Sequence, residues 1–203
     1  MEPSLNSGAG TGARETNLKL TVRYEQALAF AHNIHRGQWR KGTDIPYISH
    51  LLAVSGLVLE AGGDENQAIA GLLHDMLEDQ GARTSYEEIQ LLFGGEVARI
   101  VRACSDTEEL PKPPWRDRKT AYLAHLEEAD PAVLRVSLAD KLHNSRSILT
   151  DLREHGDGLW KRFNASREDQ LWYYQGLAAV FAQRLPSPQQ RDLAEVVDKL
   201  VIL

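Results

Sequence analysis

The sequence predicts an all-α protein that forms one domain of about eight to ten helices. Apolar residues recur at spacings of three and four along nearly the whole chain from residue 18 onward, which is typical of amphipathic helices. No segment shows the sustained alternation of apolar and polar residues that predicts a strand. The 203 residues, 42% of them hydrophobic, are enough for one core, whereas a second domain would need ~100–150 residues of its own.

We assign residues 18–203 to this helical domain and residues 1–17 to a tail. The tail is rich in Gly, Ser, Thr and Asn and has almost nothing to bury, so we expect it to be flexible. Apolar residues from Leu20 onward recur at helical spacing and predict a first helix that ends near Gly37. Glycine, aspartate and proline then predict a loop at residues 38–47.

The next two predicted helices contain most of the residues that could take part in chemistry. Residues 51–60 are expected to be helical, with Thr43 or Ser49 as the capping residue and two glycines as the stop. Asp64 is expected to cap a third helix over residues 65–79, which is apolar almost all round until its last turn.

Further helices follow to the end of the chain. The next should be capped by Thr84 or Ser85 and has two glutamates in its first turn, which favours a helix start. A loop at residues 106–114, which is rich in proline, interrupts the series. The predicted helices cover residues 85–93, 96–104, 115–127, 132–152, 166–184 and 189–201.

The overall charge argues against large anionic partners. The chain has 23 basic and 29 acidic residues, so its net charge is −6, and broad attraction to nucleic acid or anionic lipid is not expected. The longest uncharged apolar run is far shorter than the ~20 residues of a membrane span, and the N-terminus lacks the plan of a signal peptide. The one cysteine, Cys104, is expected to be a packed thiol. We therefore expect a cytoplasmic protein that binds neither nucleic acid nor membrane, with its oligomeric state open.

Two basic segments stand out from this acidic chain. Residues 36–41 and residues 112–119 each carry a net charge of +3. Such local positive charge suits a small, highly charged anion, although solvated loops would have the same composition.

The end of the third predicted helix combines apolar residues with histidine and carboxylates. At about 100° per residue, four polar side chains fall on one arc of that helix: His74, Asp75, Glu78 and Asp79. Burying carboxylates beside leucines is costly unless a cation compensates, and histidine with aspartate suits a divalent metal. A helix end that exposes its charges to water is the alternative.

Two other segments could complete such a site. His50 stands at the start of an apolar helix, where its side chain can face inward. Asp140, Asn144 and Ser147 follow at i, i+4 and i+7 and form a polar stripe on a helix that is otherwise aliphatic. A stripe of short polar groups suits a lined cavity, with a solvated face as the alternative.

Three motifs resemble those of the HD-domain metal-dependent phosphohydrolases, and within them the branch of guanosine tetraphosphate (alarmone) hydrolases. Arg40-Lys41-Gly42 followed by PYISH at residues 46–50 resembles the RK…PYxxH segment of that branch. HDMLED at residues 74–79 resembles its HDxxED motif, and LADKLHN at residues 138–144 matches its LADKLxN motif. The motifs occur in the family's order, and the resemblance extends from about residue 24 to residue 182.

The resemblance implies a metal site and a catalytic pair. One manganese ion would be held by the histidine after PYxx, the HD pair and the aspartate of LADKLxN, here His50, His74, Asp75 and Asp140. Glu78 and Asp79 would orient and deprotonate the attacking water and manage the protons of the leaving group.

The resemblance also implies contacts to a small purine nucleotide. Arg40 and Lys41 would pack on the purine and contact phosphate. Lys141 would help with phosphate charge, and Asn144 and Ser147 would hold the nucleoside.

The reaction implied by the resemblance is hydrolysis of the 3′-pyrophosphate of an alarmone such as (p)ppGpp, which gives GDP or GTP and pyrophosphate. The sequence does not distinguish guanine from adenine, so the same reaction on (p)ppApp stays open, as does another nucleotide phosphohydrolase. The alternative of another class is a nucleotide-binding regulatory module without turnover. The intact Glu78 and Asp79 argue against that alternative.

Overall fold

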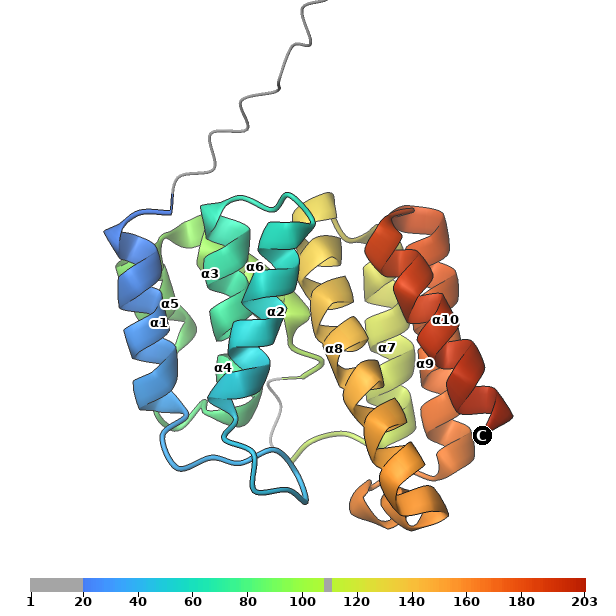
Figure 1. The fold of residues 1–203 in the computed structure, drawn as a ribbon. Helices are drawn as coiled ribbons and strands as arrows, with labels where there is room; N and C mark the ends of the chain where they lie inside the picture. Colours follow the sequence, from blue (N-terminus) through green and yellow to red (C-terminus); the bar gives the residue numbers. More distant parts are fainter. Residues whose placement is uncertain (1–19, 108–110) are drawn as a thin grey trace, which may run out of the picture.

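The computed structural model describes residues 20–107 and 111–203, in which helices pack side by side (Figure 1). The helices are α1 (Val22–Ile34), α2 (Ile48–Glu60), α3 (Glu65–Leu73), α4 (Met76–Asp79), α5 (Tyr86–Phe93), α6 (Gly95–Cys104), α7 (Trp115–Glu128), α8 (Pro131–His155), the 3₁₀ helix η1 (Gly156–Arg162), α9 (Arg167–Arg184) and α10 (Pro188–Ile202). Within the described ranges, the β structure is limited to an isolated bridge between Trp39 and Pro46. The prediction of an all-α protein is confirmed, and the tail predicted at residues 1–17 lies outside the described residues.

Helices α2, α3 and α8 form the centre of the molecule. α2 packs against both α3 and α8, and α3 also contacts α1 and α6. On the other side, α8 packs against α9 and α10, while α7 contacts α9. Figure 1 accordingly shows α1 to α6 on one side of α8, and α7, α9 and α10 on the other. The histidine and aspartate motifs of the sequence are therefore carried by helices that share one interface.

Side-chain caps fix the starts of several helices, and those at Asp64 and Ser85 were predicted from the sequence. Asp64 and Ser85 each accept a hydrogen bond from the backbone N–H three residues further on, at the starts of α3 and α5. Asp130 accepts from two backbone N–H groups at the start of α8, and Pro131 occupies the first helical position, where no donor is needed. The caps at Asp64 and Asp130 thus fix the start of α3, which ends just before His74, and the start of α8, which carries Asp140.

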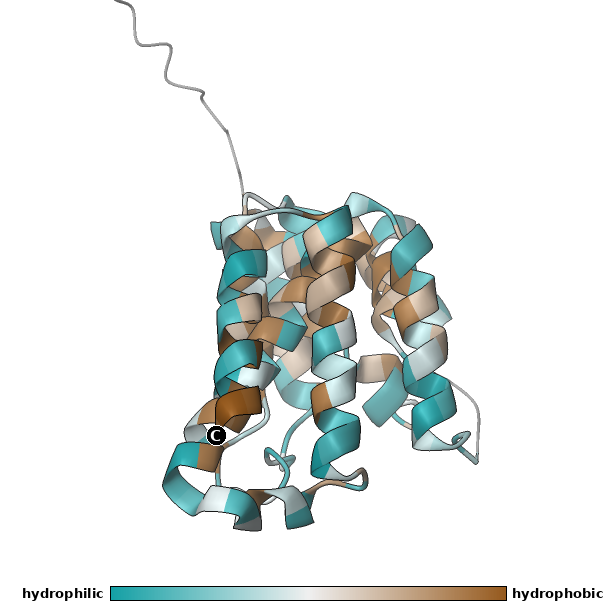
Figure 2. Cartoon of the chain, turned by 90° about the vertical axis from the view of Figure 1, so that its right-hand side faces the viewer, coloured by the Kyte–Doolittle hydropathy of each residue, from teal (hydrophilic) through white to brown (hydrophobic). Residues whose placement is uncertain are grey.

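The apolar faces of the helices meet in one core. Figure 2 shows hydrophobic residues gathered between the helices and hydrophilic residues on the outward faces. Large side chains at the centre are fully buried, and they include Leu51, Ile69, Leu72, Leu138, Leu142 and Phe181. Each such side chain contributes ~1.5–3 kcal/mol through burial. The core therefore surrounds the polar residues of α2, α3 and α8 with a medium of low polarity.

Helix α2 begins three residues earlier than the sequence predicted, at Ile48. Ser49 lies inside its first turn, and Tyr47 stands at the cap position without a side-chain hydrogen bond. Thr43 does not cap the helix either, because its hydroxyl bonds within the turn at residues 40–45. Both capping candidates named from the sequence were therefore wrong.

The helix predicted over residues 65–79 is interrupted at His74 and Asp75. Asp75 has φ −93° and ψ 0°, in the sparsely populated region between helix and strand. The ring Nδ1 of His74 lies 2.9 Å from the carbonyl oxygen of Gly71, an acceptor that the helix would otherwise use for its own ladder. The prediction of one continuous helix was wrong, because hydrophobic spacing does not register a side chain that bonds to the helix backbone.

The loop at residues 38–47 is held against η1, an element the sequence did not predict. Lys41 Nζ donates to Asn164 Oδ1 at 3.1 Å, just beyond η1. Gly42 has φ +72°, and a Cβ there would lie 2.8 Å from a side-chain carbon of Arg162. The loop and Phe163, the residue after η1, both line the cavity described below. None of the helices in the described ranges is long and apolar enough to cross a bilayer.

Candidate functional site

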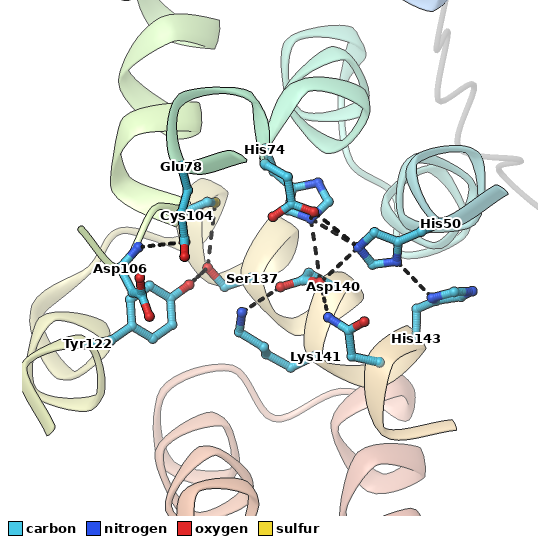
Figure 3. A network of polar contacts seen from close by, with 12 residues as sticks. His50, His74, Glu78, Cys104, Asp106, Tyr122, Ser137, Asp140, Lys141 and His143 are labelled. Atoms are coloured by element: carbon cyan, nitrogen blue, oxygen red, sulfur yellow. Dashed lines mark hydrogen bonds and ion pairs between the residues drawn. The ribbon is translucent and has the colours of Figure 1, made fainter. Parts of the chain in front are cut away.

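Four side chains from distant parts of the sequence converge between α2, α3 and α8. His50 comes from the first turn of α2, His74 and Asp75 from the interruption between α3 and α4, and Asp140 from the middle of α8. His50, His74 and Asp140 are all buried, and one ligand atom from each of the three lies within 4.8 Å of the others. Figure 3 shows the two imidazoles turned toward Asp140.

The donor atoms are spaced like the corners of a coordination shell. His50 Nε2 lies 3.3 Å from His74 Nε2, 3.2 Å from Asp140 Oδ1 and 3.4 Å from Asp75 Oδ2. His74 Nε2 lies 3.0 Å from Asp75 Oδ2 and 3.4 Å from Asp140 Oδ1. An ion bound by nitrogen and oxygen at ~2.0–2.2 Å has its ligands ~2.8–3.6 Å apart, so the spacings fit one ion among the four side chains.

The interruption after α3 allows neighbouring residues to face the same point. In a continuous helix, adjacent side chains point about 100° apart and do not meet. At the interruption, His74 Nε2 and Asp75 Oδ2 come within 3.0 Å of each other. The local backbone therefore converts a sequence pair into a structural pair.

Hydrogen bonding also prepares His74 as a donor to a cation. Its Nδ1 must donate to the Gly71 carbonyl, since a carbonyl oxygen only accepts. A neutral His74 then presents the lone pair of Nε2 to the carboxylate oxygens of Asp75 and Asp140. A lone pair facing two carboxylates is unfavourable unless a cation or a proton lies between them. This donor set fits a divalent metal ion.

The charges of the cluster shift the pKa values of its members. Burial alone would lower the pKa of His74, but Asp75 and Asp140 raise it well above its ordinary value. Burial would raise the pKa of Asp140, but the charges of Lys141 and His74 hold it well below the usual range. A proton and a metal ion therefore compete for the same atoms, and metal affinity is expected to rise with pH.

Two aromatic side chains that sequence reasoning missed orient the ligands. Tyr47 donates its hydroxyl to Asp75 Oδ2 at 2.5 Å, and its ring stacks on His35 with centroids 5.1 Å apart. His143 Nδ1 lies 2.8 Å from His50 Nδ1, so that one ring donates to the other. Tyr47 stands inside the PYISH segment and His143 inside LADKLHN, but contacts between elements leave no mark on helical spacing.

The carboxylate of Asp140 is held on both oxygens. Asn144 Nδ2 donates to Oδ1 at 2.6 Å, and Lys141 Nζ lies 2.5 Å from Oδ2. Arg40 donates in turn to Asn144 Oδ1 at 2.8 Å. The polar stripe predicted on this helix is therefore directed inward at its first two positions.

Glu78 and Asp79 lie on α4, beside the cluster rather than inside it. Glu78 Oε1 lies 2.9 Å from Lys112 Nζ, and its Oε2 is 3.4 Å from the backbone N of Asp106. Asp79 Oδ2 accepts from Gln38 Nε2 at 3.2 Å. Burial, and then the charge of Asp106, raises the pKa of Glu78. A carboxylate with a raised pKa takes up a proton more readily than an ordinary one.

A cavity of about 750 Å³ opens beside the cluster. The loop at residues 38–47, α7, α8 and α9 contribute to its walls. Basic side chains outnumber acidic ones on these walls, in a chain whose net charge is −6. The basic residues are Arg40, Lys41, Lys119, Lys141 and Arg146, and the acidic ones are Asp79 and Asp151. The cavity therefore suits an anion.

All five residues that the resemblance linked to a nucleotide line this cavity, namely Arg40, Lys41, Lys141, Asn144 and Ser147. The Arg40 guanidinium lies 5.8 Å from the centre of the Tyr47 ring. The Ser147 hydroxyl donates to the carbonyl oxygen of His143 at 3.1 Å. Asp79 also lines a neighbouring cavity of about 440 Å³, to which Glu78 and Lys112 belong. The structure thus brings the predicted contact residues together and places Asp79 at the boundary between two cavities, with Glu78 in the second.

Cys104 is a packed thiol, as the sequence predicted. It is buried, and its Sγ lies 3.6 Å from the hydroxyl of Ser137 (Figure 3). Burial raises the pKa of the thiol to about 11, so it is protonated at neutral pH.

A protein-family model matches most of this chain. The family model described as "HD domain" matches residues 27–171. Three curated relatives illustrate the range of proteins that contain similar sequence. The guanosine-3′,5′-bis(diphosphate) 3′-pyrophosphohydrolase MESH1 of Xenopus tropicalis is 38% identical over 126 residues, which are 61% of this chain and 68% of that protein.

Two bacterial relatives are much longer proteins. The probable guanosine-3′,5′-bis(diphosphate) 3′-pyrophosphohydrolase of Synechocystis is 36% identical over 126 residues, 61% of this chain and 16% of the relative. The bifunctional (p)ppGpp synthase/hydrolase SpoT of Escherichia coli is 34% identical over 151 residues, 71% of this chain and 20% of the relative. The chain therefore spans a fifth or less of these two proteins.

Two solved structures share the fold. One is described as "A metazoan ortholog of SpoT hydrolyzes ppGpp and plays a role in starvation responses"; it superimposes with a TM-score of 0.74 at 26% identity and covers 91% of this chain and 99% of its own. The other is lmo0812 from Listeria monocytogenes, with a TM-score of 0.66 at 28% identity, covering 76% of this chain and 99% of its own.

Proposed function

The chain belongs to the HD-domain family, whose model matches most of its length, and from that premise we propose that it hydrolyses the 3′-pyrophosphate of a purine nucleotide of the (p)ppGpp class. The products are GDP or GTP and pyrophosphate. The observation that carries the proposal is the buried cluster of His50, His74, Asp75 and Asp140 at the wall of a cationic cavity. The relatives named for this reaction support it. A cytoplasmic location belongs to the same proposal and rests on the unpaired Cys104.

The cavity suits a nucleotide with several phosphates. Its volume of about 750 Å³ lies within the usual range for small-molecule sites, ~300–1,000 Å³. Arg40 offers a planar guanidinium that can stack on a purine, whereas Lys41 and Lys141 offer point charges to phosphate oxygens. Asn144 and Ser147 offer short polar groups to the nucleoside. This division of roles places the base near the loop at residues 38–47.

We assign the metal ligands to His50, His74, Asp75 and Asp140, and the ion to manganese(II). Mixed imidazole and carboxylate donors suit manganese and its neighbours in the first row. When bound, a divalent ion supplies Lewis acidity, which lowers the pKa of water toward neutrality and offsets charge on phosphate oxygens. Tyr47 and His143 keep Asp75 and His50 oriented for this role.

The proton transfers are assigned to Glu78 and Asp79. Glu78 orients the attacking water and takes its proton while the water oxygen bonds to the phosphorus attached to the 3′ oxygen. The bond between that phosphorus and the 3′ oxygen breaks, and the carboxylate pair returns a proton to the 3′ oxygen as it becomes a hydroxyl. One water is consumed and one pyrophosphate leaves. The raised pKa of Glu78 makes its carboxylate a stronger base than that of an ordinary glutamate.

Release of pyrophosphate in the presence of manganese tests the proposal. Purified protein is incubated with 3′-pyrophosphorylated guanosine and adenosine nucleotides side by side, and the products are separated by chromatography. We expect pyrophosphate release that stops when a chelator is added and resumes when manganese is restored. The ratio of the two rates identifies the preferred base.

Two variants separate the metal site from general effects. Asp140→Asn should lose both bound manganese, measured by mass spectrometry, and turnover, because the carboxylate charge is removed. Glu195→Ala, which removes an exposed carboxylate on α10, should keep both. Absence of release from either nucleotide by manganese-loaded wild-type protein would overturn the proposal and favour a binding module without turnover.

A further inference from the structure

Lys119 on α7 is a cation of the main cavity to which the reaction above gives no role. Its side chain is only 17% exposed and lines the same cavity as Lys141 and Arg40. Removing an ammonium group from water is costly unless anions or dipoles replace the water. The Lys119 ammonium group therefore needs a compensating anion.

Lys119 and Lys141 reach the same region of the cavity wall from different helices. Lys119 Nζ lies 5.1 Å from the centre of the Tyr173 ring, and Lys141 Nζ lies 5.1 Å from the centre of the Tyr122 ring. Burial, and then the charge of Lys141, lowers the pKa of Lys119, which reflects the proximity of the two ammonium groups. Two ammonium groups near each other form a site for a group with more than one negative charge.

The protein's own carboxylates leave positive charge in excess here. Asp106, whose side chain is 4% exposed, uses one oxygen, Oδ2, to contact both Lys119 and Arg118, the latter at 2.6 Å. Its other oxygen, Oδ1, is buried and has no hydrogen-bond partner. The partner of Lys141 is Asp140, which we assign as a metal ligand. Asp106 therefore contacts two cations, of which Arg118 also lies 4.0 Å from Glu78, and Asp140 would be shared with the metal ion.

The two oxygens of Asp140 have different neighbours. Asn144 and Arg40 are connected to Oδ1, on the side that we assign to the nucleoside. Lys141 contacts Oδ2, and Lys119 lines the same cavity as Lys141. Oδ1 also faces His50 Nε2 and His74 Nε2, so an anion bound by Lys141 and Lys119 lies next to Asp140, one of the residues that we assign to the metal.

We propose that Lys119 is a substrate-binding residue that, with Lys141, binds the outer phosphate of the 3′-pyrophosphate group. The proposal rests on the proposed function, since that function supplies the pyrophosphate. Asp106 is a positioning residue, because it holds the Lys119 ammonium at the cavity wall and does not itself contact the substrate.

Binding of inorganic pyrophosphate to manganese-loaded protein, measured by titration calorimetry, tests the role of Lys119 without turnover. We expect Lys119→Ala to weaken pyrophosphate binding by about 10- to 100-fold, the range for a charged hydrogen bond. Lys119→Arg should restore most of the affinity. Lys199→Ala, which removes an exposed lysine on α10, should leave it unchanged.

A second variant guards against loss of folding. Lys119→Ala leaves Asp106 with Arg118 alone, so its melting temperature is compared with that of the wild type. Lys119→Gln removes the charge but keeps a donor for Asp106, and it should show the same loss of pyrophosphate affinity while melting near the wild-type temperature.

Kinetics with two substrates assigns the contact to the outer phosphate. Lys119→Gln should raise KM for a 3′-pyrophosphorylated nucleotide by about 10- to 100-fold, and should change the affinity for the corresponding 3′-monophosphate by less than about threefold. Equal effects on both nucleotides, or unchanged pyrophosphate binding in Lys119→Gln, would overturn the assignment while the proposed function stands. Pyrophosphate binding that depends on Lys119 in a protein without turnover would reject the proposed function and keep the anion site.

Discussion

The two ring nitrogens of His74 have different partners, and each has a structural consequence. Nδ1 bonds to the carbonyl of Gly71 at the point where α3 ends, while Nε2 faces Asp75 and Asp140. One side chain thus bonds to the backbone at the interruption and presents its Nε2 as a candidate metal donor. His74 Nε2 and Asp75 Oδ2 come together because of this local backbone, and not only because the two residues are adjacent in sequence.

Glu78 is the residue whose removal should separate catalysis from binding. Glu78→Gln keeps an oxygen that can accept from Lys112, so the loop at that position should be retained. The amide cannot take a proton from water, so we expect kcat to fall by about 10²- to 10⁴-fold while bound manganese and nucleotide affinity stay near the wild-type values. Near-normal kcat in Glu78→Gln would remove Glu78 from the role of base.

The pH profile of the wild type provides an independent check on the same residue. A base must be deprotonated to act, so activity falls as the pH drops through its pKa. Burial and the charge of Asp106 raise the pKa of Glu78, so the acid limb of kcat/KM should lie above the ~4.3 of an ordinary glutamate. The residual activity of Glu78→Gln should lack that limb.

The helices show which features of the fold a sequence reveals and which it does not. Asp64 and Ser85 cap their helices as predicted, because a cap is a bond between residues three apart. The start of α2 and the interruption at His74 were not predicted, because both depend on competing local bonds that periodicity does not report. The ends of elements are thus less predictable than their existence.

The close approach of α2 and α3 also determines the geometry of the site. His50 lies on α2 and His74 follows α3, so the distance between the helices sets the distance between the two imidazoles. A Cβ added at Gly71 would lie 3.1 Å from the Cα and 3.3 Å from the N of Ser55, which are backbone atoms of α2. The absence of a side chain at Gly71 therefore permits the close approach.

Gly71→Ala should force α2 and α3 apart by a few tenths of an ångström. We expect it to destabilise the protein by ~1–3 kcal/mol, the usual range for overpacking, and to weaken manganese binding as well. Urea unfolding with and without manganese measures both effects. Gly56→Ala on α2, where an added Cβ meets nothing within 4 Å, should instead stabilise by ~0.5–1 kcal/mol. Equal behaviour of the two variants would contradict the role assigned to Gly71.

At the scale of the molecule, an acidic protein concentrates positive charge in one cavity. The first basic segment predicted from the sequence contributes Arg40 and Lys41 to that cavity, and the second contributes Lys119. Lys112 and Arg118 of the second segment instead approach Glu78 and Asp106. Charge counting along the chain located the basic segments, but their ion pairs depend on how α4 and α7 meet.

The candidate ligands could be named from motif order, but their supports could not. Tyr47 bonds to Asp75 and His143 bonds to His50 only after α2, α3 and α8 have packed together. Neither contact corresponds to a spacing within one helix. The motifs therefore name the groups that we propose for the chemistry, and the packing of three helices specifies how those groups are held.

The position of bond cleavage tests the central claim most directly. The reaction is run in ¹⁸O-labelled water with manganese-loaded protein and a 3′-pyrophosphorylated guanosine nucleotide, and the products are analysed by mass spectrometry. Attack at the phosphorus attached to the 3′ oxygen predicts one labelled oxygen in the released pyrophosphate and none in the nucleoside 5′-diphosphate. Label in the nucleotide, or release of orthophosphate in place of pyrophosphate, would contradict the account of this site.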